Sequence, residues 1–162
     1  MSSSCSTRPG AEAVTAVSHR STVYLRATPE RVWHALTNAD ESGLYWGHRN
    51  VSTWLPGSPW EHQRTDGSGI ADVIGIVEVS DRPYRLVTTW AGPEGQRAEG
   101  PSRVTFDLRH WQDLTRLTVT HENLADEDER ADAERGWSAV LSNLKTYLET
   151  GHPLPQQPWL MP

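Results

Sequence analysis

Two expected helices stand at either end of a long run of predicted strands, and this order constrains the fold of the chain more than any other feature. The first helix lies within Ala27–Thr37 and the second within residues 126–150. Between them, apolar and polar residues alternate in short segments that turn residues separate, which is typical of antiparallel strands with one buried face. A sheet held between a short and a long helix can enclose a cavity. The order therefore points to a small-molecule site without identifying the molecule.

The segment before the strands carries the signals of a helix N-terminus. Thr28 can cap the helix, and Pro29 takes the first helical position, where a missing N–H is harmless. Apolar residues at helical spacing predict one buried stripe: Val32, Ala35, Leu36 and Ala39. We expect this helix to end in turn residues at Asn38–Gly43 and a single helical turn to follow at Leu44–Gly47.

The second expected helix begins with acidic residues, which suit the positive end of a helix dipole. Its apolar residues repeat at i, i+3, i+4, i+7 and i+11 and predict a single buried stripe: Trp137, Val140, Leu141, Leu144 and Leu148. Gly151 is expected to end the helix. Gly136, inside the helix, costs about 1 kcal/mol relative to alanine and is tolerated where something must approach the backbone closely.

The pattern gives about seven strands and two tails. The first strand is expected at Ser21–Ala27, and the others lie between Asn50 and His121. Residues 1–17 are small and polar without a period, so we expect a disordered tail. Residues 152–162 are rich in proline. A floppy extended tail is the favoured interpretation there, and the alternative is that Trp159 and Leu160 fold back as a lid.

Composition excludes several classes of function. The 162 residues suffice for one domain with a real core, and the net charge of −6 argues against nucleic acid and anionic membrane surfaces as partners. No signal peptide is recognised and no apolar run approaches the length of a membrane span, so we expect a cytoplasmic protein. Cys5 is the only cysteine, which precludes an intrachain disulfide.

Eight tryptophans accompany a single phenylalanine. Tryptophan is large, is rarely buried completely, and carries an N–H that needs a partner. Some of these rings should fill the core, and others should line a cavity, where they offer flat faces and N–H donors to a bound ring.

Strand alternation selects polar candidates for that cavity. His62 and His121 are candidate general acids or bases, since histidine titrates near neutral pH, although each can equally be a core histidine or a ligand anchor. Arg64 can pair with a ligand carboxylate. We predict that the ligand contacts come from these strand faces and from the helices near the expected cavity: Trp33, Trp46, Trp60, Arg64, Thr88, Trp90, Phe106, Trp137 and Leu141.

Other kinds of site lack their sequence signals. The seven histidines are scattered without metal-ligand spacing on one element, and Cys5 is remote from them. No Gly-x-Ser-x-Gly segment marks a serine nucleophile, and no glycine-rich loop joins a strand to a helix as a phosphate site. We therefore expect no metal and no cofactor.

Several segments of the chain resemble a known family. They are similar to the bacterial homologues of the activator of the heat-shock ATPase, within the superfamily of START domains, polyketide cyclases and pollen allergens. The resemblance covers roughly residues 18–151. Its most specific pieces are Thr28–Trp33, Gly75–Val79, Arg85–Trp90, Thr115–His121 and Gly136–Trp137.

The resemblance implies a helix-grip fold, an α+β domain whose curved antiparallel sheet wraps around the long C-terminal helix and leaves a cavity between them. It carries over no catalytic residue, and fold alone is poor evidence of function. Three functions stay open: a binding protein for a small hydrophobic or aromatic ligand, a cofactor-independent cyclase, dehydratase or isomerase, and a module that regulates a chaperone. A homodimer is also expected to be possible, through a sheet edge or the Trp159 tail.

Overall fold

Seven antiparallel strands form one curved sheet in the computed structural model, which describes residues 17–94 and 97–162. The strand order is β1-β7-β6-β5-β4-β3-β2, so β1 and β2 are its edges. The elements in chain order are β1 (Val17–Leu25), α1 (Pro29–Thr37), α2 (Ala39–Tyr45), β2 (His48–Ser52), β3 (Pro59–Arg64), β4 (Ala71–Asp81), β5 (Arg85–Trp90), β6 (Ser102–Trp111), β7 (Leu114–Leu124), α3 (Glu127–Thr150) and the 3-10 turn η1 (Pro158–Leu160).

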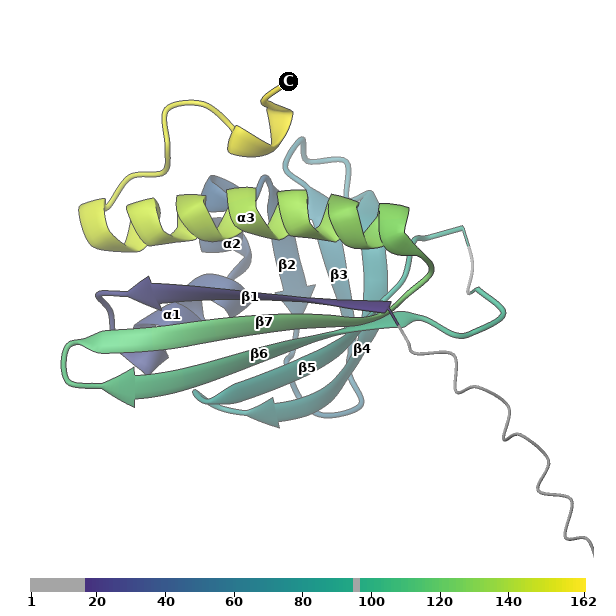
Figure 1. The fold of residues 1–162 in the computed structure, drawn as a ribbon, viewed down its shortest axis with the longest axis horizontal. Helices are drawn as coiled ribbons and strands as arrows, with labels where there is room; N and C mark the ends of the chain where they lie inside the picture. Colours follow the sequence, from purple (N-terminus) through teal and green to yellow (C-terminus); the bar gives the residue numbers. More distant parts are fainter. Residues whose placement is uncertain (1–16, 95–96) are drawn as a thin grey trace, which may run out of the picture.

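The long helix α3 lies along one face of the sheet (Figure 1). It packs on β1 at one sheet edge and touches α2, which in turn packs on β2 at the other edge. The predicted stripe faces inward: Trp137, Leu141 and Leu144 are buried against the sheet. Each such side chain contributes about 1.5–3 kcal/mol through its burial. The predicted α+β helix-grip architecture, a seven-stranded sheet wrapped around a long C-terminal helix, is confirmed.

The helix ends follow the predicted capping signals. The Thr28 hydroxyl accepts a hydrogen bond from Arg31 N at 3.2 Å. Asp126 caps α3 through Glu129 N at 2.9 Å. Gly151 ends α3 with a left-handed backbone (φ 85°), which only glycine adopts without strain.

The segment Asn38–Gly43 differs from the sequence expectation, because it forms most of a second helix instead of a turn. Asn38 ends α1 and also begins α2, since its side-chain oxygen accepts from Glu41 N at 3.0 Å. Asparagine, aspartate and serine are residues of turns and of helix N-caps alike. The residue types that predicted a turn in this segment therefore belong to a helix cap instead.

The C-terminal segment also differs from the favoured expectation. Residues 152–162 fold back over α3 in place of a floppy tail (Figure 1). Leu154 N donates to Asn143 Oδ1 at 2.6 Å, and the Trp159 ring lies against Gly47. The predicted N-terminal tail falls outside the described residues, apart from Val17, which begins β1. Within residues 17–94 and 97–162, no helix is long and apolar enough to cross a membrane.

Gly75 of β4 lets Trp60 of β3 reach across to β5. The two residues are paired in the ladder, and Trp60 Nε1 donates to the Thr89 carbonyl at 2.8 Å. A Cβ at position 75 would lie 1.9 Å from that carbonyl oxygen and 2.4 Å from Trp60 Nε1. Both distances are far inside van der Waals contact, so only glycine fits.

Gly75→Ala should lower the free energy of unfolding by about 2–4 kcal/mol, because it displaces the Trp60 indole and breaks its hydrogen bond. Urea denaturation followed by circular dichroism measures this change. Gly136→Ala is the control: no atom lies within 4 Å of its added Cβ, so better helix propensity should raise stability by up to about 1 kcal/mol. Equal stability of Gly75→Ala and the unmodified protein would contradict the packing described.

Candidate functional site

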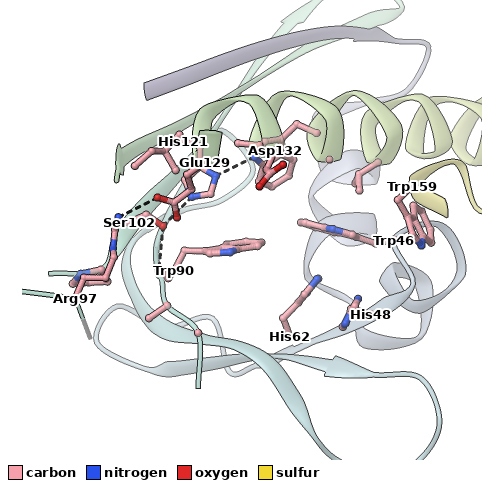
Figure 2. A pocket seen from close by; sticks show the side chains of 18 residues that line it. Trp46, His48, His62, Trp90, Arg97, Ser102, His121, Glu129, Asp132 and Trp159 are labelled. Carbon is pink, nitrogen blue, oxygen red and sulfur yellow. Dashed lines mark hydrogen bonds and ion pairs between the residues drawn. The ribbon is translucent and has the colours of Figure 1, made fainter. Parts of the chain in front are cut away.

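An open cavity of about 530 Å³ lies between α3 and the sheet (Figure 2). This volume lies within the range of small-molecule sites. Its walls come from α2, β2, β3, β5, β6, β7 and α3, with Trp159 of η1 added from the C-terminal segment. The lining residues are Trp46, His48, His62, Trp90, Ala91, Gly92, Arg97, Pro101, Ser102, His121, Leu124, Glu129, Asp132, Ala133, Gly136, Trp137, Val140 and Trp159.

Tryptophan rings form the main wall of the cavity. Trp46 and Trp90 are stacked, with centroids 6.2 Å apart and ring planes at 24°. Trp137 meets Trp46 edge-on at 5.5 Å and Trp90 at 5.7 Å. Nε1 of Trp46 and of Trp90 has no protein partner among the described residues, so both stay available as donors. The wall thus offers flat apolar faces and two free N–H groups.

Five of the predicted site residues meet at this cavity: His62, His121, Trp46, Trp90 and Trp137. The other six do not line it: Trp33, Trp60, Arg64, Thr88, Phe106 and Leu141.

Those six residues fall into three groups. Trp33 and Leu141 fill the core, and Trp60, Thr88 and Phe106 surround a void of about 10 Å³ beneath Trp46 and Trp90. Arg64 is half-exposed and bonds Asp72, 2.9 Å away. Strand alternation identified the inward face correctly for Trp60, Thr88 and Phe106, but it does not distinguish a wall of the cavity from the core behind it.

Sequence reasoning missed several lining residues. Gly136 is one for which a signal existed, since a glycine inside a helix leaves the space of a side chain open toward the cavity. Trp159 lies in the segment expected to be floppy. His48, Arg97 and Ser102 carried no signal, because their place depends on strand register and on loop packing.

His121 is held by hydrogen bonds at both ring nitrogens (Figure 2). The Trp137 indole, which can only donate, lies 3.2 Å from Nδ1, so Nδ1 accepts. Nε2 therefore carries the proton and donates to Ser102 Oγ at 2.9 Å, and Ser102 donates to the Trp90 carbonyl at 2.9 Å. Burial lowers the pKa of His121 to about 4, with smaller contributions from His19 and Arg97. His121 is a neutral connector of β6, β7 and α3.

Among the described residues, His62 has a hydrogen-bond partner at only one of its ring nitrogens. Its Nδ1 lies 2.6 Å from Asn50 Oδ1, and its ring stacks on His48 with centroids 4.2 Å apart. Burial lowers the pKa of His62 to about 3, with a further contribution from the neighbouring His48. His62 is therefore neutral at physiological pH.

His48 forms a carboxylate–histidine pair at the edge of the cavity. Its Nε2 lies 2.8 Å from Asp72 Oδ2, and Arg64 bonds both oxygens of the same carboxylate. These bonds, first from Arg64 and then from His48, lower the pKa of Asp72 to about 2. Asp72 does not itself line the cavity, and its bond to His48 places it next to the cavity wall.

The mouth of the cavity carries charged side chains. Glu129 bonds Arg97 at 3.1 Å, and Asp132 bonds Arg135 on the outer surface of α3. Across the part of the chain that the structure describes, no three His, Cys, Asp or Glu side chains gather as a metal site.

A wider hollow of about 900 Å³ lies over the opposite face of the sheet. It is lined by partly exposed apolar side chains, among them Val51, Ile74 and Ile76. No histidine lines it, and its single tryptophan, Trp60, already donates its indole N–H to Thr89. The cavity under α3 therefore offers the richer chemistry.

Comparison with known families decides the membership of the chain. Residues 26–149 match the family described as Activator of Hsp90 ATPase homolog 1-like protein. The chain belongs to this family. The predicted resemblance is thereby confirmed over most of its expected range.

Several solved structures share the fold of this chain. The Aha1 dimer from Colwellia psychrerythraea is 24% identical, with 83% of this chain and 98% of that chain covered and a TM-score of 0.70. CalU16 from Micromonospora echinospora is 20% identical (84% and 78% covered, TM-score 0.67). PFC0360w, an HSP90 activator from Plasmodium falciparum, is 21% identical (84% and 97% covered, TM-score 0.66). At these identities the likeness establishes the fold alone. Comparison with curated proteins gives no match.

The two buried histidines should make the stability of this protein sensitive to acid. Each has a lower pKa in the folded state than its ordinary 6.5, so the unfolded chain binds more protons below pH 6.5. Stability should therefore fall as the pH decreases from 6.5 toward 4, by up to about 1.4 kcal/mol per pH unit for each histidine.

Denaturation at several pH values between 6.5 and 5 tests this expectation. His62→Gln and His121→Gln should each reduce the slope of the unfolding free energy against pH by about 1.4 kcal/mol per pH unit, which corresponds to one bound proton. His110→Gln, at an exposed position on β6, is the control and should leave the slope unchanged. Unchanged slopes in both buried variants would show that these histidines are not held neutral.

Proposed function

We propose that this protein binds a small hydrophobic or aromatic ligand in the cavity under α3. The observation that carries the proposal is the set of tryptophan rings, Trp46, Trp90, Trp137 and Trp159, around one open volume. Stacked or edge-on aromatic pairs gain about 0.5–1.5 kcal/mol beyond their area burial. A planar ligand can use several of these rings at once.

The backbone of α3 supports the same proposal at Gly136. This glycine lines the cavity, and an added Cβ there would meet no atom within 4 Å. Glycine lowers helix stability by about 1 kcal/mol relative to alanine. Its presence leaves room for a ligand beside the helix.

A second candidate is a cofactor-independent enzyme of the cyclase, dehydratase or isomerase type acting in the same cavity. The observation that favours it is the pair of His48 and Asp72, because a carboxylate orients the ring for proton transfer. His62 and His121 stay predictions as catalytic residues. A low pKa makes His62 a weak base, and His121 uses both nitrogens internally.

The family match supports a third candidate, regulation of a chaperone ATPase. The acidic start of α3 is one surface that can meet a basic partner, although acidic residues also suit the N-terminus of any helix. A change in the ATPase rate of a purified Hsp90-type chaperone on addition of this protein tests it. An unchanged rate would count against this candidate and would leave ligand binding unaffected.

Filling the cavity from α3 should abolish ligand binding. Gly136→Leu projects a side chain into the open volume, and Ser138→Leu places the same residue on the exposed surface of α3. With 2-methoxynaphthalene as the probe, titration calorimetry should give saturable binding for the unmodified protein and for Ser138→Leu. Gly136→Leu should lose at least about tenfold in affinity, about 1.4 kcal/mol. Absence of saturable binding of both this ether and the corresponding phenol, 2-naphthol, to the unmodified protein would refute the proposal for aromatic ligands.

Native mass spectrometry of the purified protein, beside the same sample denatured, should show an added mass in the native state only. Extraction of that molecule would then name the ligand class. Retention of the added mass by Gly136→Leu would place the molecule elsewhere and contradict the assigned cavity.

A further inference from the structure

The ring orientation of His62 follows from a chain of hydrogen bonds that ends on a backbone carbonyl. Asn50 is buried, and its Nδ2 donates to the Leu36 carbonyl at 2.9 Å. A carbonyl only accepts, so the amide nitrogen of Asn50 must face Leu36 and its Oδ1 must face His62. The amide of Asn50 therefore has one orientation.

This orientation decides which nitrogen of His62 carries the proton. Nδ1 lies 2.6 Å from Asn50 Oδ1, an atom that only accepts, so Nδ1 is the donor. A neutral ring with its proton on Nδ1 has an unprotonated Nε2. Burial and the stacked His48 both oppose a second proton on the ring. Nε2 of His62 is thus a hydrogen-bond acceptor.

That acceptor faces the cavity without a partner. No hydrogen bond to Nε2 of His62 exists among the described residues. Among those residues, Thr88 Oγ1 is the single fully buried side-chain nitrogen or oxygen without a hydrogen-bond partner. Nε2 of His62 is therefore not fully buried, and it is reached from the cavity that its ring lines. Figure 2 shows His62 directed toward the space between Trp90 and Trp46. His121 offers no such atom, because both of its nitrogens are bonded within the protein.

We propose that His62 determines which aromatic ligands the cavity takes, by accepting a hydrogen bond at Nε2 from a hydroxyl or N–H group attached to the ligand ring. This inference rests on the proposed binding function and names the ligand class as phenols and their N–H equivalents. An aromatic ligand without a donor strips water from Nε2 and leaves it unpaired, which costs affinity. The free indole N–H groups of Trp46 and Trp90 cannot supply the missing donor. Both rings pack against the ring of His62, and neither is hydrogen-bonded to it.

A matched pair of ligands tests the assignment. 2-Naphthol and 2-methoxynaphthalene have nearly the same aromatic surface, and only the first can donate. Calorimetric titration of the unmodified protein should give at least about fivefold tighter binding of 2-naphthol, the range expected for one hydrogen bond to a buried acceptor. Equal binding of the two ligands would overturn the role of His62 while the proposed binding function stood. Binding of neither would refute the proposed function itself.

Variants of His62 separate hydrogen bonding from shape. His62→Phe keeps a flat ring without an acceptor and should remove the preference for 2-naphthol, because the affinity for 2-naphthol falls more than that for the methyl ether. His62→Gln restores an acceptor and should recover part of the preference. His110→Phe, on the exposed end of β6, should retain the full preference. An equal loss for both ligands in His62→Phe would show that His62 contributes shape only.

A measurement on the unmodified protein keeps the test independent of how the variants fold. Imidazole nitrogen-15 spectra distinguish a protonated nitrogen from a bare one. For His62 they should show a bare Nε2 that shifts when 2-naphthol is added and stays in place when 2-methoxynaphthalene is added. A protonated Nε2 in the free protein would overturn the inference.

Discussion

The contacts of Trp46 hold α3 at its distance from the sheet. Its ring meets Trp137 of α3, Trp90 of β5, Phe106 of β6 and His62 of β3. A curved sheet cannot close onto a helix unless large side chains fill the space between them or a cavity remains. Trp46, at the end of α2, does both, because one side of its ring packs in the core and the ring also lines the cavity. The position of α2 therefore sets the position of this part of the cavity wall.

The two buried histidines show why residue type alone does not assign a role. Both were predicted as candidates for proton transfer, and both have a strongly lowered pKa. A donor-only indole fixes the proton of His121 on Nε2, and an amide held by a carbonyl fixes that of His62 on Nδ1. Both ring nitrogens of His121 are hydrogen-bonded within the protein, whereas Nε2 of His62 has no partner among the described residues. The partners that decide this come from three different elements, α1, β2 and α3, which no local sequence pattern brings together.

Much of the fold was predictable, because its signals are local. Helix caps at Thr28 and Gly151, the apolar stripe of α3 and the alternation of the strands all depend on residues within one or two turns of each other. The site was predictable only in part. Strand alternation found His62, His121 and Trp90, and the expected helical segments supplied Trp46 and Trp137. Trp33 belongs to the core instead, and the places of His48 and Trp159 depend on packing between distant segments. The helix α2 was not predicted, because Asn38 both ends α1 and begins α2, and asparagine at that position indicates a turn equally well.

The cavity wall has one section that is anchored less firmly than the rest. Trp159 belongs to a segment tied to α3 through the bond from Leu154 N to Asn143, and its ring rests on the bare backbone of Gly47. Segments with few buried contacts open at a small fraction of the global unfolding energy. Opening of residues 152–162 would remove the Trp159 ring from the cavity wall, while Trp46, Trp90 and Trp137, which belong to the folded core or pack against it, would stay in place.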